Sequence, residues 1–277
     1  MQELNKNEEA VSQHFDNVAF EYEQQRLTMS SSVEFAITVR YLQRYIPDSA
    51  RVAEVGVGSG QYTELLAQKG CQLHLVDVSE RLLESTVARL EQAGLASQIL
   101  DSQRASATHM PHLQTESVDV VLYLGPLYHL CDLADRQLAV REAARILRPG
   151  GWLYAAAINR LTYLRDTFRQ HPNNGAQRWG FCRQLLSDGN TDSQRTPLLG
   201  PGHLSSSEEF RDLFRDSFEE VILVGLESFT GGSQEIFPSL SAENAEAWLD
   251  LVEQTGKTID ALGLADHFLY IGRRKRA

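Results

Sequence analysis

Residues 51–63 read RVAEVGVGSGQYT, a short apolar run followed by three glycines at alternating positions, Gly56, Gly58 and Gly60. An apolar run that enters a glycine cluster and continues into the helix-forming residues 61–68 predicts a strand, a tight loop and a helix. Glycine suits such a loop because it adopts positive φ and has no Cβ to keep a ligand away from the backbone. The first turn of the following helix presents unpaired N–H groups, so the loop can bind a polar or anionic group.

A second predicted strand, residues 73–76, ends at Asp77, seventeen residues after Gly60. A carboxylate at this position can accept hydrogen bonds from both hydroxyl groups of a ribose. The glycine loop and Asp77 therefore predict a site for a nucleotide-type cofactor. Dinucleotide enzymes usually have the spacing G-x-G-x-x-G. This loop has G-x-G-x-G instead, with an acidic residue, Glu54, two positions before the first glycine.

The segment EVGVGSG, beginning at Glu54, resembles motif I of the class I S-adenosylmethionine (AdoMet)-dependent methyltransferases. The resemblance extends from about residue 15 to residue 273. It includes VDVS at residues 76–79, SVDVV at 117–121 and LRPGG at 147–151. The segment LGPLYHL at residues 124–130 is similar to a variant found in a bacterial branch of small-molecule methyltransferases, the GPLYHL motif.

The resemblance implies a single methyltransferase domain over residues 1–277 with a Rossmann-like α/β fold. We expect a seven-stranded, mostly parallel sheet with an antiparallel last strand, helices on both faces and a helical lid insertion. In chain order these are N-terminal cap helices (1–47), an AdoMet-binding core (48–158), the lid insertion (159–203) and the C-terminal half of the sheet (204–277). The apolar spacing predicts helices at residues 5–27, 31–45 and 242–262.

The same resemblance implies AdoMet as cofactor and S-adenosylhomocysteine as product. In the cap, the F-D-x-x-A-x-x-Y pattern that ends at Tyr22, followed by Arg26, is similar to a helix that closes over the cofactor in related enzymes. Ser106 stands where the family commonly has an aspartate that binds the adenine amino group, and a hydroxyl accepts that bond more weakly. The implied cofactor-binding residues are Tyr22, Arg26, Glu54, Gly56, Val57, Gly58, Gly60, Tyr62, Asp77, Val78, Ser106, Ala107, Leu124 and Gly125.

Two candidate catalytic residues follow the fourth predicted strand, residues 118–124, which is nearly all apolar. Ligands of open α/β sheets bind at the carboxyl ends of the strands, so Tyr128 and His129 should reach the transferred methyl group. His129 is the candidate general base because the unperturbed pKa of histidine lies near working pH. Tyr128 is the candidate ring that orients the sulfonium. A structural role for His129, in its loop or against adenine, is the alternative.

The predicted insertion, residues 159–203, mixes aromatic and arginine residues with polar loops, which makes it too long for a simple connection and too polar for core. Its candidate substrate-binding residues are Tyr163, Phe168 and Trp179, with His203 as a secondary candidate. The alternative is that these aromatic rings only hold the insertion onto the domain.

Composition narrows the possible partners. The net charge is −11 and the isoelectric point about 5.2, which disfavours a nucleic-acid groove. No apolar run approaches a membrane span, and the first ten residues are unlike a signal peptide. Three widely spaced cysteines fit reduced thiols, and the dispersed histidines give no metal site. We therefore expect a cytoplasmic monomer or homodimer without metal.

The leading hypothesis is an enzyme that moves a methyl group from AdoMet to an O, N or C atom of a small-molecule acceptor by in-line displacement. Three alternatives stay open. The site could serve another AdoMet reaction, such as aminopropyl transfer or a rearrangement. The chain could be a nicotinamide-dependent oxidoreductase, although its glycine spacing differs. It could also be a non-catalytic subunit that binds AdoMet.

Overall fold

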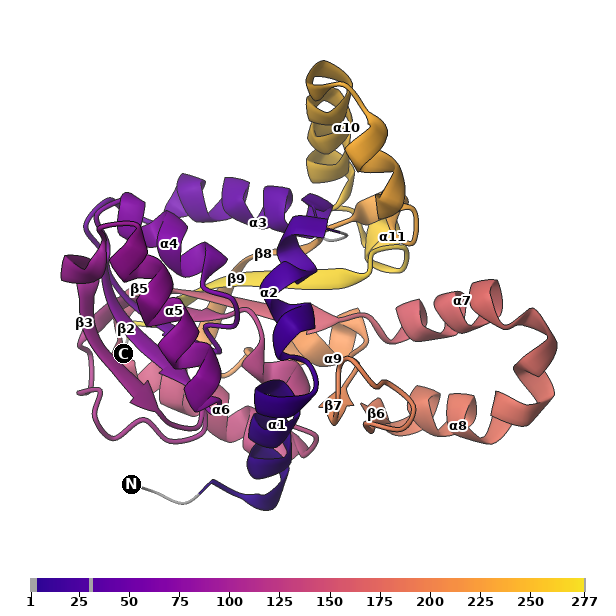
Figure 1. Cartoon of the computed structure of the whole chain (residues 1–277), viewed down its shortest axis with the longest axis horizontal. Helices are drawn as coiled ribbons and strands as arrows, with labels where there is room; N and C mark the ends of the chain where they lie inside the picture. The colour runs from indigo at the N-terminus through magenta and orange to yellow at the C-terminus, as the bar shows by residue number, and fades with distance from the viewer. Residues whose placement is uncertain (1–3, 30–31, 277) are drawn as a thin grey trace.

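The computed structural model describes residues 4–29 and 32–276, with the backbone only for residues 26–29 and 32. Its centre is a seven-stranded sheet in the order β3-β2-β1-β4-β5-β9-β8 (Figure 1). Strand β9 is antiparallel to both of its neighbours, and the other pairs are parallel. The predicted fold class is confirmed. The strands are β1 (Arg51–Val55), β2 (Gln72–Asp77), β3 (Ile99–Arg104), β4 (Val118–Tyr123), β5 (Leu147–Ile158), β8 (Phe218–Gly225) and β9 (His267–Arg274).

Helices cover both faces of the sheet. In Figure 1, α3 (Ser32–Tyr45) and α4 (Gln61–Gln68) lie above it and α6 (Leu133–Ile146) lies below. Side chains alternate between the two faces along the central strands: Val120 and Leu122 of β4 join one apolar cluster, whereas Val121 and Tyr123 join the other. Because both faces are buried, the central strands are almost wholly apolar, as parallel strands usually are. Outside the N-terminal cap and the insertion, which are described below, the other α-helices are α5 (Glu80–Gln92), α9 (Ser207–Asp212), α10 (Ala242–Thr255) and α11 (Ile259–Leu262).

The N-terminal cap differs from the single helix predicted over residues 5–27. It contains two helices, α1 (Lys6–Asn17) and α2 (Phe20–Met29). The chain turns between them because the amides of Val18 and Ala19 both donate to the carbonyl of His14, at 2.8 and 3.0 Å. Helix α1 is fixed to the body by the side chain of Asn7, whose Nδ2 donates to the carbonyl of His129 over 2.7 Å.

The predicted helix over residues 242–262 is also divided in two, and Gly256 explains why. A Cβ at this position would lie 2.5 Å from the carbonyl oxygen of Gly225 in β8. The backbone therefore approaches the sheet too closely for a side chain, and α10 ends here before the short α11 begins. Among the described residues, no helix is both long and apolar enough to cross a membrane.

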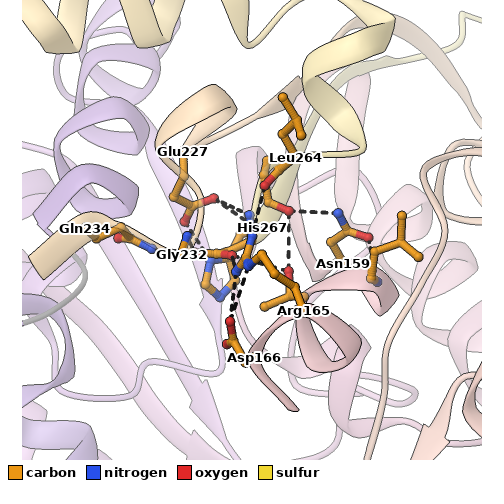
Figure 2. Close-up of polar contacts among 12 residues, drawn as sticks. Asn159, Arg165, Asp166, Glu227, Gly232, Gln234, Leu264 and His267 are labelled. Atoms are coloured by element: carbon orange, nitrogen blue, oxygen red, sulfur yellow. Dashed lines mark hydrogen bonds and ion pairs between the residues drawn. The ribbon is translucent and has the colours of Figure 1, made fainter. Parts of the chain in front are cut away.

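The segment predicted as an insertion contains two helices that extend away from the sheet, α7 (Arg160–Gln170) and α8 (Gly175–Asp188) (Figure 1). A short antiparallel pair, β6 (Asn190–Thr191) and β7 (Gly202–His203), follows. We call α7 and α8 the arm. Its base is fixed by Asn159 and Arg165, which are labelled in Figure 2. Nδ2 of Asn159 donates to the carbonyl of Ala265 over 2.7 Å, and Arg165 forms an ion pair with Asp266.

Candidate active site

A cavity lies at the carboxyl ends of β1, β2 and β4, where the sequence places the glycine loop, Asp77 and residues 124–130. Helices α1 and α2 cover it, and we call it the inner cavity. Most of the predicted cofactor-binding residues line it. These are Gly56, Val57, Gly58, Tyr62, Asp77, Val78, Ala107, Leu124 and Gly125.

The loop after β1 needs glycine for two separate reasons. Gly56, Gly58 and Gly60 all have positive φ, at 78°, 55° and 75°, which side chains rarely adopt. In addition, a Cβ at Gly58 would lie 2.8 Å from Oε1 of Glu23, and one at Gly60 would lie 2.9 Å from the side chain of Thr86. Gly60 thus serves the packing of α4 against α5 and does not line the inner cavity.

Asp77 is almost completely buried at the floor of the inner cavity. Its Oδ1 accepts the amide N–H of Ser79 at 2.9 Å, and its Oδ2 lies 3.4 Å from the amide of Gly58. Burial raises the pKa of Asp77 to about 6, and the charge of Glu23 acts in the same direction. The carboxylate is therefore held rigidly where it can accept hydrogen bonds from a ligand.

The other predicted cofactor-binding residues lie elsewhere. Glu54 is buried within β1, where burial raises the pKa of its carboxyl group to about 8. The hydroxyl of Ser106 is hydrogen-bonded to Glu8 and to Thr108, so it does not face the inner cavity. Tyr22 lines a second cavity. The side chain of Arg26 lies outside the described residues.

Two acidic residues of the cap that sequence reasoning missed also line the inner cavity: Glu8 of α1 and Glu23 of α2. With Asp77 they give this cavity three carboxylates, whereas none of the described side chains that line it belongs to lysine or arginine. An acidic residue in the first turn of a surface helix is common, so neither position stood out in the sequence. The inner cavity therefore favours a cationic ligand.

Tyr128 and His129 lie in a short 3₁₀ helix, Pro126–His129, and line both cavities. The ring of His129 packs edge-on against Phe15, with centroids 5.1 Å apart, and lies 4.8 Å from the ring of Tyr128. Its Nδ1 is 3.2 Å from the carbonyl oxygen of Pro201. A carbonyl can only accept, so Nδ1 carries the proton in this hydrogen bond, and Nε2 carries the lone pair of the neutral ring.

The second cavity, which we call the outer cavity, has a volume of about 610 Å³. It lies between the cap, helix α7 and residues 194–199, and it meets the inner cavity at Phe15, Glu23, Tyr128 and His129. Tyr163 of α7 lines it, as predicted for a substrate-binding residue, and packs edge-on against Phe181 at 5.3 Å between centroids.

The three remaining predicted substrate-binding residues do not line the outer cavity. Phe168 and Trp179 are 73% and 62% exposed, because the arm projects from the sheet and their sides of α7 and α8 are not covered. His203 is buried, with Nε2 2.7 Å from Oε1 of Glu209 and Nδ1 2.9 Å from Oδ1 of Asn190. These partners give His203 a structural environment away from the outer cavity.

Sequence reasoning missed a carboxylate–imidazole pair, Glu227 and His267 (Figure 2). Glu227 is fully buried, and the partly buried His267 lines the outer cavity. Oε1 of Glu227 lies 2.7 Å from Nδ1 of His267, and Oε2 accepts the amides of Asp266 and His267 at 2.9 and 2.8 Å. Donor atoms of Glu34, Glu227 and His267 lie within 4.8 Å of one another, the spacing that a metal site needs. The close Glu227–His267 contact makes this a hydrogen-bonded cluster.

Comparison with known proteins agrees with the resemblance of the sequence motifs to those of methyltransferases. Residues 53–155 match the family model described as a methyltransferase domain. A ubiquinone biosynthesis O-methyltransferase of Xanthomonas oryzae pv. oryzae is 36% identical over 112 residues, which is 40% of this chain and 44% of that protein. The match thus spans less than half the length of this curated relative.

Solved structures share the fold over most of the chain. A 1,6-didemethyltoxoflavin-N1-methyltransferase of Burkholderia thailandensis, solved with S-adenosylhomocysteine, is 14% identical with a TM-score of 0.61, covering 100% of this chain and 93% of that one. The [4+2]-cyclase SpnF is 15% identical with a TM-score of 0.55, covering 87% and 81%. At this identity the likeness concerns the fold alone. The family model thus gives residues 53–155 as a methyltransferase domain, and the solved structures agree with the strand order of the sheet.

Proposed function

We propose that this protein is an AdoMet-dependent methyltransferase that methylates an O, N or C atom of a small-molecule acceptor. The observation that carries the proposal is the acidic inner cavity, in which Glu8, Glu23 and Asp77 surround a glycine loop. AdoMet carries a sulfonium and an ammonium group, so its net charge suits this cavity. The two phosphates of a nicotinamide cofactor would meet three carboxylates, which disfavours the oxidoreductase alternative.

In this proposal AdoMet occupies the inner cavity and supplies a methyl group on a positively charged sulfur, which is a good leaving group. Asp77 accepts hydrogen bonds from the ribose hydroxyls, and the backbone at Gly56 and Gly58 allows close approach of the ligand. Tyr128 presents an aromatic ring at the junction of the two cavities, where a sulfonium would be stabilised by the ring face.

The acceptor occupies the outer cavity, with Tyr163 of α7 and Tyr22 of the cap in its wall. Tyr128 and His129 line both cavities, so an acceptor in the outer cavity would meet the methyl donor beside them. Positioning of this kind contributes roughly 7–11 kcal/mol in favourable cases. The named relatives methylate oxygen in one case and nitrogen in another, so the acceptor atom is not assigned.

His129 is the proposed general base for an acceptor that must lose a proton, because its Nδ1 hydrogen bond to Pro201 places the lone pair on Nε2. A general base in this position increases the reaction rate about 10²–10⁴-fold. The pH dependence of kcat for wild type and His129→Asn, with an acceptor found by screening, tests this role. Equal profiles for the two proteins would contradict it.

The proposal as a whole is tested by calorimetric titration with AdoMet, S-adenosylhomocysteine and NADH. We expect the wild type to bind the first two and not NADH. Asp77→Ala should weaken their binding roughly 100-fold, because hydrogen bonds to a charged group contribute about 1.5–3 kcal/mol. Asp260→Ala, which removes an exposed carboxylate on α11, is the matched control. Binding of NADH alone would overturn the proposal.

A further inference from the structure

Glu8 occupies an unusual position for a carboxylate in the first turn of a surface helix, because it is only 5% exposed and lines the inner cavity. Its Oε2 accepts the amide N–H of Asn5 at 2.9 Å and so completes the N-terminal cap of α1. Its Oε1 accepts the hydroxyl proton of Ser106, and the hydroxyl of Thr108 lies 3.5 Å away. The carboxylate is thus fixed from both the cap and the segment after β3.

Ser106 orients Glu8 and does not itself line the inner cavity. The amide of Thr108 donates to the Ser106 oxygen over 2.9 Å, and the hydroxyl proton of Ser106 is directed to Oε1 of Glu8. A carboxylate oxygen has room for more than one donor. Oε1 can therefore accept a further hydrogen bond from a group within the inner cavity.

The surroundings of Glu8 fit a flat heteroaromatic group. Val78, Leu82, Ala105 and Ala107 line the same part of the inner cavity with small or apolar side chains. Ala105 and Ala107 follow β3, which lies beyond β2 when the strands are counted from the glycine loop. A nucleoside with its ribose at Asp77 can therefore place its base in this apolar slot, with the edge of the base toward Glu8.

We propose that Glu8 recognises the 6-amino group of the adenine of the methyl donor, an inference that rests on the proposed function. A carboxylate can only accept hydrogen bonds, so it pairs with the 6-amino group of adenine. It disfavours a 6-oxo group, because two oxygens would then face each other without a proton between them. Recognition of adenine is thereby assigned to helix α1 of the cap, with Ser106 as the residue that positions Glu8.

The test compares two ligands on each variant: S-adenosylhomocysteine and S-inosylhomocysteine, which has oxygen in place of the 6-amino group. We expect calorimetry to show that the wild type prefers the adenine compound by at least tenfold, which corresponds to about 1.4 kcal/mol. In Glu8→Gln the preference should fall at least tenfold or reverse. The amide oxygen can retain the bond to the Asn5 amide, which turns the NH₂ group toward the ligand.

Glu9→Gln, on the exposed side of the same helix, should leave the preference unchanged. Because each variant is measured with both ligands, a general loss of structure lowers both affinities and leaves their ratio intact. An unchanged ratio in Glu8→Gln would overturn the inference about Glu8. Failure of the wild type to bind S-adenosylhomocysteine would instead overturn the proposed function.

Discussion

Glu54 and Asp77 have very different surroundings, although both are buried carboxyl groups on the neighbouring strands β1 and β2. Asp77 faces the inner cavity and accepts two backbone N–H groups, whereas Oε2 of Glu54 has no hydrogen-bond partner among the described residues. Burial raises the pKa of Glu54 from 4.5 to about 8. The protonated form of Glu54 is therefore the one that the fold accommodates.

This burial predicts how stability depends on pH. Between pH 4.5 and about 8 the folded protein keeps a proton on Glu54 that the unfolded chain has lost, so the free energy of unfolding decreases as pH rises through this window. Glu54→Gln should reduce that decrease by more than about 1 kcal/mol. Urea unfolding at pH 5, 6.5 and 8 measures the decrease in the free energy of unfolding, and Glu84→Gln, at an exposed position, is the control. A decrease as steep as in wild type would contradict the prediction.

The glycine loop shows what can be predicted from a few residues and what cannot. Local spacing was sufficient to predict the loop, Asp77 and the residues after β4, because each follows an apolar strand and ligands bind at the strand ends. Glu8 and Glu23 could not be predicted in this way. They reach the inner cavity from α1 and α2, and no local pattern encodes where a separate helix docks.

At the level of elements, a partly buried ion pair between Arg165 and Asp266 is one of the contacts that hold the arm at its base. Arg165 of α7 forms an ion pair with Asp266, and Oδ2 of Asp266 also accepts a hydrogen bond from Nε2 of Gln234 over 2.6 Å. Burial would raise the pKa of Asp266, but the hydrogen bonds and charges of Arg165, His267 and Gln234 together outweigh it, and the pKa is lowered. The charged form of Asp266 therefore contributes stability at neutral pH. This contribution is lost as the pH falls below the pKa that Asp266 has in the unfolded chain.

Asp266→Asn should release the arm without unfolding the sheet. Loss of a charged hydrogen-bond partner costs about 1.5–3 kcal/mol, so limited proteolysis within α7 and α8 at pH 7 should accelerate roughly tenfold or more. Asp166→Asn is the matched control, because Asp166 also contacts Arg165 but is 41% exposed in its side chain. An equal acceleration in both variants would show that the Arg165–Asp266 pair has no special role.

Element boundaries were predicted less well where tertiary contacts decide them. The helix expected over residues 242–262 is interrupted at Gly256, because the backbone there meets Gly225 of β8. The exposed rings of Phe168 and Trp179 are candidates for a substrate wall on sequence, beside the alternative that they only hold the insertion onto the domain. Which side of α7 or α8 faces the outer cavity depends on how the arm leaves the sheet, and sequence spacing does not contain that information.

For the whole molecule, the net charge of −11 is not spread evenly, since three carboxylates line the inner cavity without a described lysine or arginine among its lining residues. The sequence supported only the general statement that an acidic protein disfavours nucleic acid. The fold brings Glu8 and Glu23 of the cap close to Asp77 at the end of the sheet. The clustered negative charge then favours a cationic ligand in the inner cavity.

The closeness of Glu23 to Gly58 has a consequence for product inhibition. In the proposed reaction, methyl transfer would change the cofactor from a net charge of +1 to zero. The carboxylates would then hold the product S-adenosylhomocysteine less strongly than AdoMet, which would favour turnover. Glu23→Gln should lower the ratio of AdoMet to S-adenosylhomocysteine affinity roughly fivefold at low salt. Glu21→Gln, an exposed neighbour on α2, should not. Calorimetric dissociation constants for both ligands decide it, and an unaltered ratio in Glu23→Gln would show that the cap's charge does not help the enzyme to discard its product.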